Sequence, residues 1–374
     1  MQQPILGAEQ MPMRKQWNLQ QLDQRDSTLL KGLAIVFIVL HNFFHFVSPA
    51  RQNEFTFDPG AYRVFLQEVV RPSHAIQAFF SFFGFLGIQA FIFISAYGLA
   101  KSHWDGPATW TEFMRSRIKK LYPMFLLIVL PWLIATTVLA GPWSMVHSIL
   151  LPVVAALLGV STLLGFGLPP VGPWWFIPFI MQMYALWFGL RWVARRFGWQ
   201  GLLAMAAAGI AITCVFNPLL ASRNINLLMT PIGRMPAICL GILAARYPVR
   251  IHGWLASIGV AVLLLGNAYA ALFPFAAFGS LLAMLWIYDR VRGLVRDSGL
   301  LFRIGECSLL IFLLNAIVRN QLVSYASTPG WQLYCGFISA ALSIAVANLI
   351  ARLVETPRVK KPASVPVLGT TSEV

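Results

Sequence analysis

Apolar segments of roughly twenty residues alternate with short polar segments along most of the chain, and a helix of that length can cross the hydrocarbon core of a bilayer. We therefore predict an all-α, polytopic integral membrane protein with about ten transmembrane helices. The predicted spans cover residues 32–48, 76–100, 121–141, 174–192, 201–220, 227–245, 254–272, 274–288, 307–325 and 332–354.

An eleventh apolar segment, residues 146–168, contains Pro152 and is followed by a stretch rich in proline and glycine. Lysine and arginine in short loops stay on the cytoplasmic side, so their distribution indicates whether this segment crosses. With a cytoplasmic N-terminus and no crossing, 22 of the 28 Lys and Arg residues fall in cytoplasmic segments and 5 fall outside. A crossing would invert every later loop. We therefore predict a re-entrant or outer-surface element here and place both termini in the cytoplasm.

The composition agrees with a membrane protein and excludes two other classes. Hydrophobic residues make up 58% of the 374 residues and charged residues only 11%, with a mean hydropathy of +0.70. A soluble globular domain carries about a quarter charged residues. The net charge of +15 is mostly the topology signal, with some attraction to anionic lipid, so no nucleic-acid partner is expected.

The polar ends divide the chain into three regions. Residues 1–28 hold no apolar segment, so the first span is expected to serve as the insertion signal. We predict a cytoplasmic N-terminal tail over 1–28, a membrane domain over 29–357 and a flexible cytoplasmic tail over 358–374. The four cysteines lie in or beside apolar segments without metal-ligand spacing, so no metal site is expected.

Two histidines on the first predicted span are the strongest candidates for chemistry. His41 follows Lys31 by ten residues, which places it roughly 15 Å further along a helix, near the membrane midplane. His45 lies one turn further on the same face. An ionisable group at this depth is costly and usually functional, and imidazole accepts a proton near neutral pH. The alternative is a pair of histidines that only form hydrogen bonds between helices.

Four other residues within predicted spans have two interpretations each. Arg234, between two prolines, could bind a carbonyl oxygen of a substrate or an anion, or could only reach toward the membrane surface or pair with a helix carbonyl. Trp175 and Gln182 fall on one helical stripe; a tryptophan at the end of a span is often an interface anchor, whereas an amide at depth needs partners. Asn315 is a second such amide.

The loop over residues 101–120 ends in a cluster of cations just before a predicted span: Arg115, Arg117, Lys119 and Lys120. The cluster is part of the signal that keeps this loop in the cytoplasm. It could also form a cradle for a cytoplasmic phosphorylated ligand, because guanidinium and ammonium groups bind phosphate oxygens. Both interpretations stay open.

Six short motifs follow one another along the chain. They are LKGLAIVFIVLH at 30–41, AFIFISAYGL at 90–99, RSRIKKLYP at 115–123, WFIPFIMQMY at 175–184, IGECSLLIFLLN at 304–315 and ETP at 355–357. In this order they resemble the motifs of the membrane acyltransferase-3 family, the ten-span bacterial O-acyltransferases of cell-surface glycans. The resemblance covers about residues 30–357.

Three positions depart from the pattern of that family. The gap between Lys31 and His41 is one residue shorter than the commonest spacing. Ser-Ala-Tyr replaces Ser-Gly-Phe in the second motif. Asn315 stands where a histidine is usual.

The resemblance implies transfer of an acyl group, with acetyl expected, from cytoplasmic acyl-CoA to a hydroxyl of an extracytoplasmic or lipid-linked glycan, such as an exopolysaccharide or a lipopolysaccharide. Acyl-CoA is then a co-substrate, and no tightly bound cofactor is expected. The resemblance also implies a bacterial inner-membrane location, contact with membrane lipid, and the machinery of polysaccharide synthesis or export as a candidate partner.

The same resemblance suggests roles for the matching residues. His41 would act as general base on the acceptor hydroxyl or form a transient acyl-histidine, with His45 as the second choice. Arg234 or Gln182 would stabilise the developing oxyanion. The residues expected to bind acyl-CoA are Lys31, Arg115, Arg117, Lys119 and Lys120, and those expected to contact the acceptor are His45, Trp175, Tyr184 and Asn315.

Two other function classes fit the same pattern. A transporter or flippase of a lipid-linked glycan would also have about ten spans, a proline-broken segment and polar groups near the midplane. Against it, the sequence shows no inverted repeat, and acidic residues such as Glu54 fall in predicted loops. An inactive sensor or scaffold is the third class.

Overall fold

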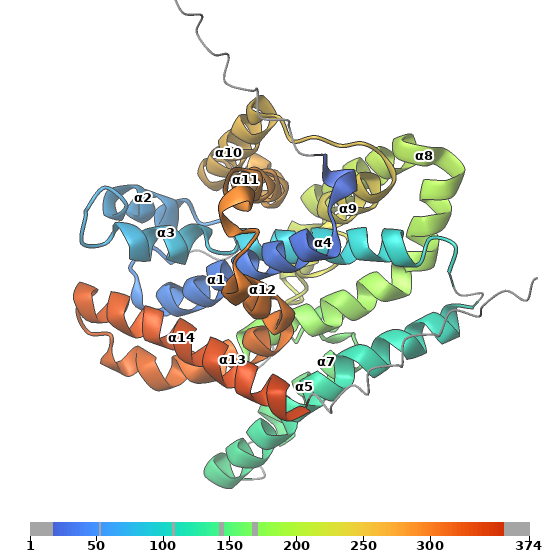
Figure 1. Ribbon diagram of the computed structural model, residues 1–374. Coiled ribbons are helices and arrows are strands. Elements are labelled where there is room, and N and C mark those ends of the chain that lie inside the picture. The colour runs from blue at the N-terminus through green and yellow to red at the C-terminus, as the bar shows by residue number, and fades with distance from the viewer. Residues whose placement is uncertain (1–17, 52–53, 107–108, 142–145, 167–170, 355–374) are drawn as a thin grey trace, which may run out of the picture.

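The computed structural model describes residues 18–51, 54–106, 109–141, 146–166 and 171–354, and these residues form helices and connecting loops (Figure 1). The helices are α1 Gln24–Val47, α2 Pro59–Glu68, α3 Ala75–Phe83, α4 Leu86–Ser102, α5 Trp110–Ala140, α7 Leu151–Leu157, α8 Phe176–Ala221, α9 Met235–Arg246, α10 Gly253–Ala268, α11 Phe273–Val295, α12 Gly299–Glu306, α13 Ser308–Leu322 and α14 Pro329–Val354.

The helices confirm the predicted class of a polytopic, all-helical membrane protein. Seven helical segments in the described part of the chain are long and apolar enough to cross a membrane, and α9 and α10 are shorter apolar helices. One of the seven contains α8, which holds two predicted spans, 174–192 and 201–220. Gly198 interrupts α8 with a φ of +60°, a conformation that glycine adopts at low cost, so the chain turns there without a loop.

Three predicted spans differ most clearly from the helices of the structure. The span predicted at 121–141 belongs to α5, which begins at Trp110, so the cations predicted in the preceding loop lie on a helix. The segment 227–245 is helical only from Met235 apart from one short 3₁₀ turn, because Pro231 and Pro236 lack the backbone donors that an earlier helix would need. The segment 76–100 is split into α3 and α4 at Gly84 and Phe85. The first helix begins at Gln24, where Asp23 accepts a hydrogen bond from the backbone amide of Asp26 and caps the helix.

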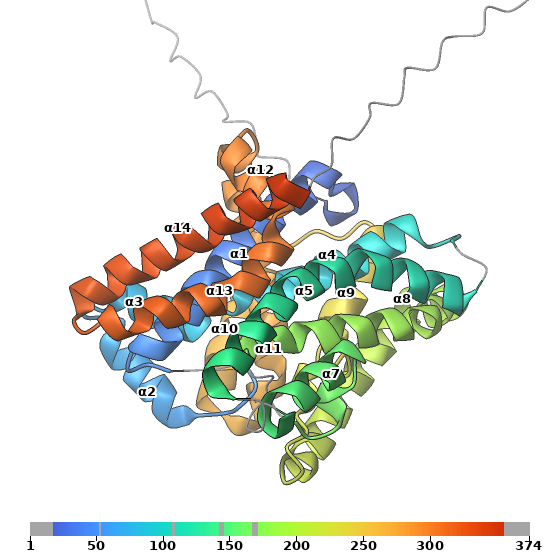
Figure 2. The same cartoon turned by 90° about the horizontal axis from the view of Figure 1, so that it is seen from below.

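Helix α1 lies at the centre of the bundle and packs against α3, α4, α12, α13 and α14 (Figures 1 and 2). Its approach to α3 and α4 is unusually close. A Cβ atom placed on Gly84 would lie only 2.5 Å from Cβ of His41, and one placed on Gly87 would lie 2.2 Å from the carbonyl oxygen of Ala34. Glycine at both positions therefore lets the backbones meet.

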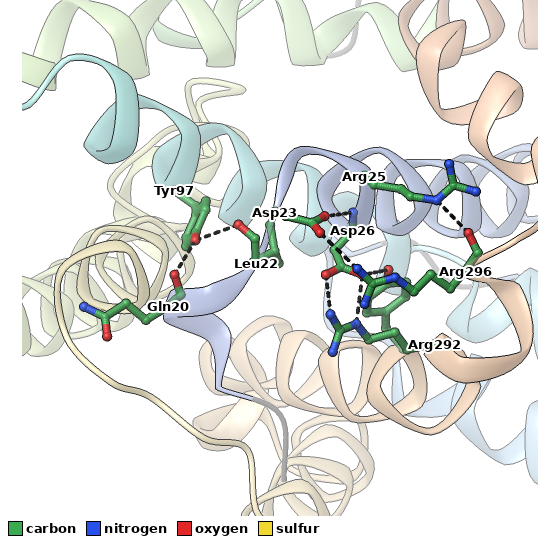
Figure 3. A network of polar contacts seen from close by, with 9 residues as sticks. Gln20, Leu22, Asp23, Arg25, Asp26, Tyr97, Arg292 and Arg296 are labelled. Atoms are coloured by element: carbon green, nitrogen blue, oxygen red, sulfur yellow. Dashed lines mark hydrogen bonds and ion pairs between the residues drawn. The ribbon is translucent and has the colours of Figure 1, made fainter. Parts of the chain in front are cut away.

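The start of α1 is fixed by a buried ion pair (Figure 3). Arg292 of α11 donates to both carboxylate oxygens of Asp26, at 2.8 and 2.6 Å, and Tyr288 donates to the same carboxylate at 3.1 Å. Beside it, Arg296 donates to Asp23 at 3.3 Å. We call this end of the bundle, where α1 begins and α4 ends, the basic face, and the end where α1 and α13 finish the opposite face.

The described part of the apolar segment 146–168, residues 146–166, forms no helix long enough to cross a membrane. A π-helical turn over Val146–Leu150 runs into α7, and the two together span roughly 18 Å, well short of the thickness of the hydrocarbon core. The segment is tied to its neighbours, because the Tyr122 hydroxyl donates to the carbonyl oxygen of Leu157, and Gln182 donates to Gly159 and Thr162 at 2.9 and 2.8 Å. These bounds agree with the predicted re-entrant or outer-surface element.

Candidate active site

A cavity of about 790 Å³ opens at the basic face between α1, α4, α5 and α8. Four cations line it, and they come from three different helices: Lys31, Lys101, Arg117 and Lys120. Ser95, Tyr97 and Tyr184 line the same cavity. Cations that converge on one polar cavity provide a site for phosphate groups.

A second cavity, of about 260 Å³, adjoins the first and lies deeper in the bundle. The two cavities share Lys31, Ser95 and Tyr184. Apart from these residues, Glu306 and Ser308, the wall of the deep cavity is apolar and consists of Ile38, Ile88, Phe91, Leu121, Phe176, Ile180, Leu309 and Phe312. Its shape and lining fit a narrow, mostly apolar ligand segment that enters from the basic face.

The helical phase of α5 separates the four loop cations that the sequence groups together. Arg117 and Lys120 are three residues apart, so they share a face of the helix, and both line the cavity. Arg115 and Lys119 project elsewhere; both are exposed, and neither is among its lining residues. The structure therefore brings Lys31, Arg117 and Lys120 together and leaves Arg115 and Lys119 outside.

His103, to which the sequence assigned no role, holds Arg117 in place. Nε2 of His103 lies 2.5 Å from Nη2 of Arg117. Partial burial, together with the positive charges of Arg117, Lys120 and Arg191, lowers the pKa of His103 below its usual range. The imidazole is therefore neutral and accepts a hydrogen bond from the guanidinium, which keeps Arg117 directed at the cavity.

His41 is buried, with 7% of its surface exposed, one turn beyond Ile38, which lines the deep cavity. Its Nδ1 lies 3.0 Å from the backbone carbonyl oxygen of Phe80, and its ring packs edge-on against Phe85. A carbonyl oxygen only accepts hydrogen bonds, so the neutral imidazole carries its proton on Nδ1 and presents the lone pair of Nε2. This is the tautomer that a general base needs.

Two further predicted site residues lie close to His41. His45 lies beside His41 itself, and Asn315 contacts Asn42, the next residue in the chain. The rings of His41 and His45 are 5.5 Å apart, as expected for one turn of α1. The side chain of Asn42 donates to Oδ1 of Asn315 at 2.7 Å and thereby links α1 to α13. Asn315 is buried, and its own amide donates to the carbonyl oxygen of Phe312, so both faces of this amide are used.

Arg234 does not contact His41 in the described residues. It forms a buried ion pair with Glu54 at 2.8 Å and donates to the carbonyl oxygen of Leu228 at 2.7 Å. The Glu54 carboxylate also accepts from Gln89 at 3.2 Å. Glu54 lies in the loop after α1, as predicted, but this loop turns inward and buries the carboxylate against the arginine.

Gln182 and Trp175 have structural partners that the sequence did not reveal. The Gln182 amide donates to Gly159 and Thr162, so it fixes the segment that follows α7. Trp175 is buried and packs edge-on against Phe55, with 4.9 Å between ring centroids, so it is not an anchor at the membrane interface. The oxyanion role of Arg234 and Gln182, and contact of Trp175 with an acceptor, stay predictions.

Within the described part of the chain, no group of three or more His, Cys, Asp or Glu residues is arranged to hold a metal ion.

A family model described as an acyltransferase domain matches residues 25–352. The matched range includes His41 and the cavity residues Lys31, Arg117 and Lys120. No curated protein and no solved structure matches the chain.

Proposed function

Because the chain belongs to the acyltransferase-3 family, we propose that this multi-pass membrane protein transfers an acyl group, acetyl in the first instance, from cytoplasmic acyl-CoA to a hydroxyl of an extracytoplasmic or lipid-linked glycan. One observation carries the proposal. Two adjoining cavities lead from a cluster of cations at the basic face to Ile38, one helical turn from His41. Exopolysaccharide and lipopolysaccharide are acceptors of the proposed class.

The orientation follows from charge. The basic face carries Lys101, Arg117, Lys120 and the arginines of α8 and α11, and loops rich in Lys and Arg stay in the cytoplasm. We therefore place this face on the cytoplasmic side of a bacterial inner membrane, where acyl-CoA is present. The glycan acceptor then approaches from the opposite face.

The two cavities suit the two parts of acyl-CoA. Arg117, Lys120, Lys101 and Lys31 would bind the phosphates at the mouth, because charge-assisted hydrogen bonds to phosphate are strong. The pantetheine arm is long and narrow and would occupy the deep cavity between Ile38 and Phe312. The thioester would then lie beyond Ile38, within reach of His41.

The chemical step uses His41 as general base. Nε2 takes the proton of the acceptor hydroxyl while the hydroxyl oxygen attacks the thioester carbonyl carbon. The tetrahedral intermediate collapses with cleavage of the C–S bond, and the CoA sulfur takes up the proton, so an ester and free CoA are formed. An acyl-histidine formed first on Nε2 gives the same products in two steps.

A transport function has one observation in its favour. The buried carboxylate of Glu54, paired with Arg234, is the kind of group that ion-coupled carriers place within the bundle. A flippase of lipid-linked glycan is therefore the second candidate function.

One experiment separates the two candidates. Purified protein in proteoliposomes is incubated with acetyl-CoA labelled in the acetyl group and with a lipid-linked or free oligosaccharide. Label in the oligosaccharide, or on a histidine of the protein, supports the acyltransferase. Translocation of the lipid-linked oligosaccharide without any transfer of label contradicts it and supports the flippase.

A further inference from the structure

Arg319, near the end of α13, is a buried arginine with no carboxylate partner among the described residues. Only 7% of its surface is exposed. Its guanidinium donates to the backbone carbonyl oxygen of Asn42 at 3.3 Å and to the side-chain oxygen of Asn320 at 3.0 and 2.8 Å. All of these acceptors are neutral.

Two other arginines of the bundle are each neutralised by a carboxylate. Arg234 is paired with Glu54 and Arg292 with Asp26, each at ion-pair distance. A charge that is buried without a counter-charge is costly. The C-terminal end of α13 and the ring of Phe46, 3.8 Å from the guanidinium carbon, offset part of this cost, but they supply no full negative charge.

The position of Arg319 relates it to the candidate base. It bonds to the carbonyl oxygen of Asn42, the residue that follows His41, and lies on the same side of α13 as Asn315. Side-chain exposure along α1 increases from His41 toward the opposite face, since His41 is buried, His45 is half-buried and Phe46 is 46% exposed. An acceptor that reaches His41 from that face would pass the guanidinium.

We propose that Arg319 binds an anionic group of the acyl acceptor and so directs its hydroxyl toward His41. The guanidinium fork matches the oxygens of a carboxylate or a phosphate. Two acceptor types carry such oxygens at the required place: a glycan with a uronic acid, and a glycan attached to its lipid by a diphosphate. The inference depends on the proposed function for the acyl transfer itself. The binding of an anion is argued separately, from the surroundings of Arg319.

The test uses wild-type protein in nanodiscs, labelled acetyl-CoA and matched acceptors. One pair is a uronic-acid oligosaccharide and its neutral methyl ester, and the other is a diphosphate-linked glycan and the same glycan without diphosphate. We expect kcat/KM about tenfold or more higher for the anionic member of at least one pair, the scale of a charge-assisted hydrogen bond. The pair that shows the preference identifies the acceptor type.

Three variants assign the preference to this side chain. Arg319→Gln should abolish it and leave the KM for acetyl-CoA unchanged. Arg319→Lys retains the charge without the fork and should retain part of the preference. Arg223→Gln, in the exposed turn after α8, should retain all of it. Equal use of anionic and neutral acceptors by the wild type, or equal losses for both in Arg319→Gln, would overturn the inference.

A binding measurement separates this inference from the reaction itself. Thermal unfolding of the wild type and of Arg319→Gln is followed with glucuronate and with inorganic pyrophosphate, both in saturating CoA so that the cation cavity at the basic face is already occupied. Stabilisation of the wild type alone supports the anion site even when no acceptor becomes acetylated, in which case only the proposed reaction fails. Absence of stabilisation in the wild type by either anion counts against the site.

Discussion

Nδ1 of His41 and the carbonyl oxygen of Phe80 lie 3.0 Å apart, and this contact fixes both the proton and the plane of the imidazole ring. The partner comes from α3, which ends at Phe83, so the base is oriented by a different helix from the one that carries it. Such a contact positions a catalytic ring while leaving its second nitrogen for the substrate.

Replacing His41 is therefore expected to remove acyl transfer. We predict that His41→Ala loses about 10²–10⁴-fold in kcat, the usual contribution of general base catalysis, or all activity if an acyl-histidine forms. Label transfer from acetyl-CoA measures the loss, with correct insertion checked by gel filtration. His252→Ala, at the start of α10, is the matched control and should transfer normally. Full glycan acetylation by His41→Ala would exclude the role.

The cations of α5 give a prediction that depends on helical phase. Arg117→Ala and Lys120→Ala should each raise the KM for acyl-CoA about tenfold or more, because each removes a charged group from the cavity. Arg115→Ala and Lys119→Ala carry the same loss of charge on the other faces and should change KM much less. Equal effects from all four variants would indicate general attraction by the basic face instead of a cavity.

The fold followed from the sequence where one physical rule acts alone. Segment length and apolarity predicted the helices, because a bilayer offers the backbone no other hydrogen-bond partners. The break at Gly198 falls between the predicted spans 174–192 and 201–220, but nothing in the basic stretch around this glycine indicates that α8 is helical on both sides of it. The start of α9 was placed too early because the prolines at 231 and 236 were counted within a span.

The candidate site was predicted in part for a similar reason. His41 stood out because an imidazole in an apolar span is rare. Glu54 did not, because nothing local to an acidic residue in a loop shows that it will fold back onto Arg234, 180 positions away. The distinction between Arg117 and Arg115 was accessible from helical spacing, but only once α5 was known to begin at Trp110, before both cations.

Gly84 yields a prediction about positioning. A Cβ at this position would lie 2.5 Å from Cβ of His41 and 2.8 Å from the carbonyl oxygen of Phe37, so Gly84→Ala must push α1 away. We expect a lower kcat with an unchanged KM for acyl-CoA, and a stability loss of about 1–3 kcal/mol from overpacking. Gly189→Ala, where an added Cβ meets nothing within 4 Å, is the control. A wild-type kcat in Gly84→Ala would show that the position of His41 is not critical.

The ion pair of Glu54 and Arg234 gives the last prediction. A structural role and a catalytic role of Arg234 predict different activities for a double variant that removes both charges. The two side chains form a buried pair, so removing either partner leaves the other uncompensated. Each single variant, Glu54→Gln or Arg234→Met, should destabilise the protein by about 3–5 kcal/mol. The double variant removes both charges and should recover most of that loss, measured by thermal unfolding in detergent. If Arg234 only holds the loop that carries Glu54, transfer activity returns together with stability. If Arg234 stabilises the oxyanion, the double variant is stable and inactive. A double variant as unstable as the singles would contradict the pairing itself, since no coupling between the two charges would then exist.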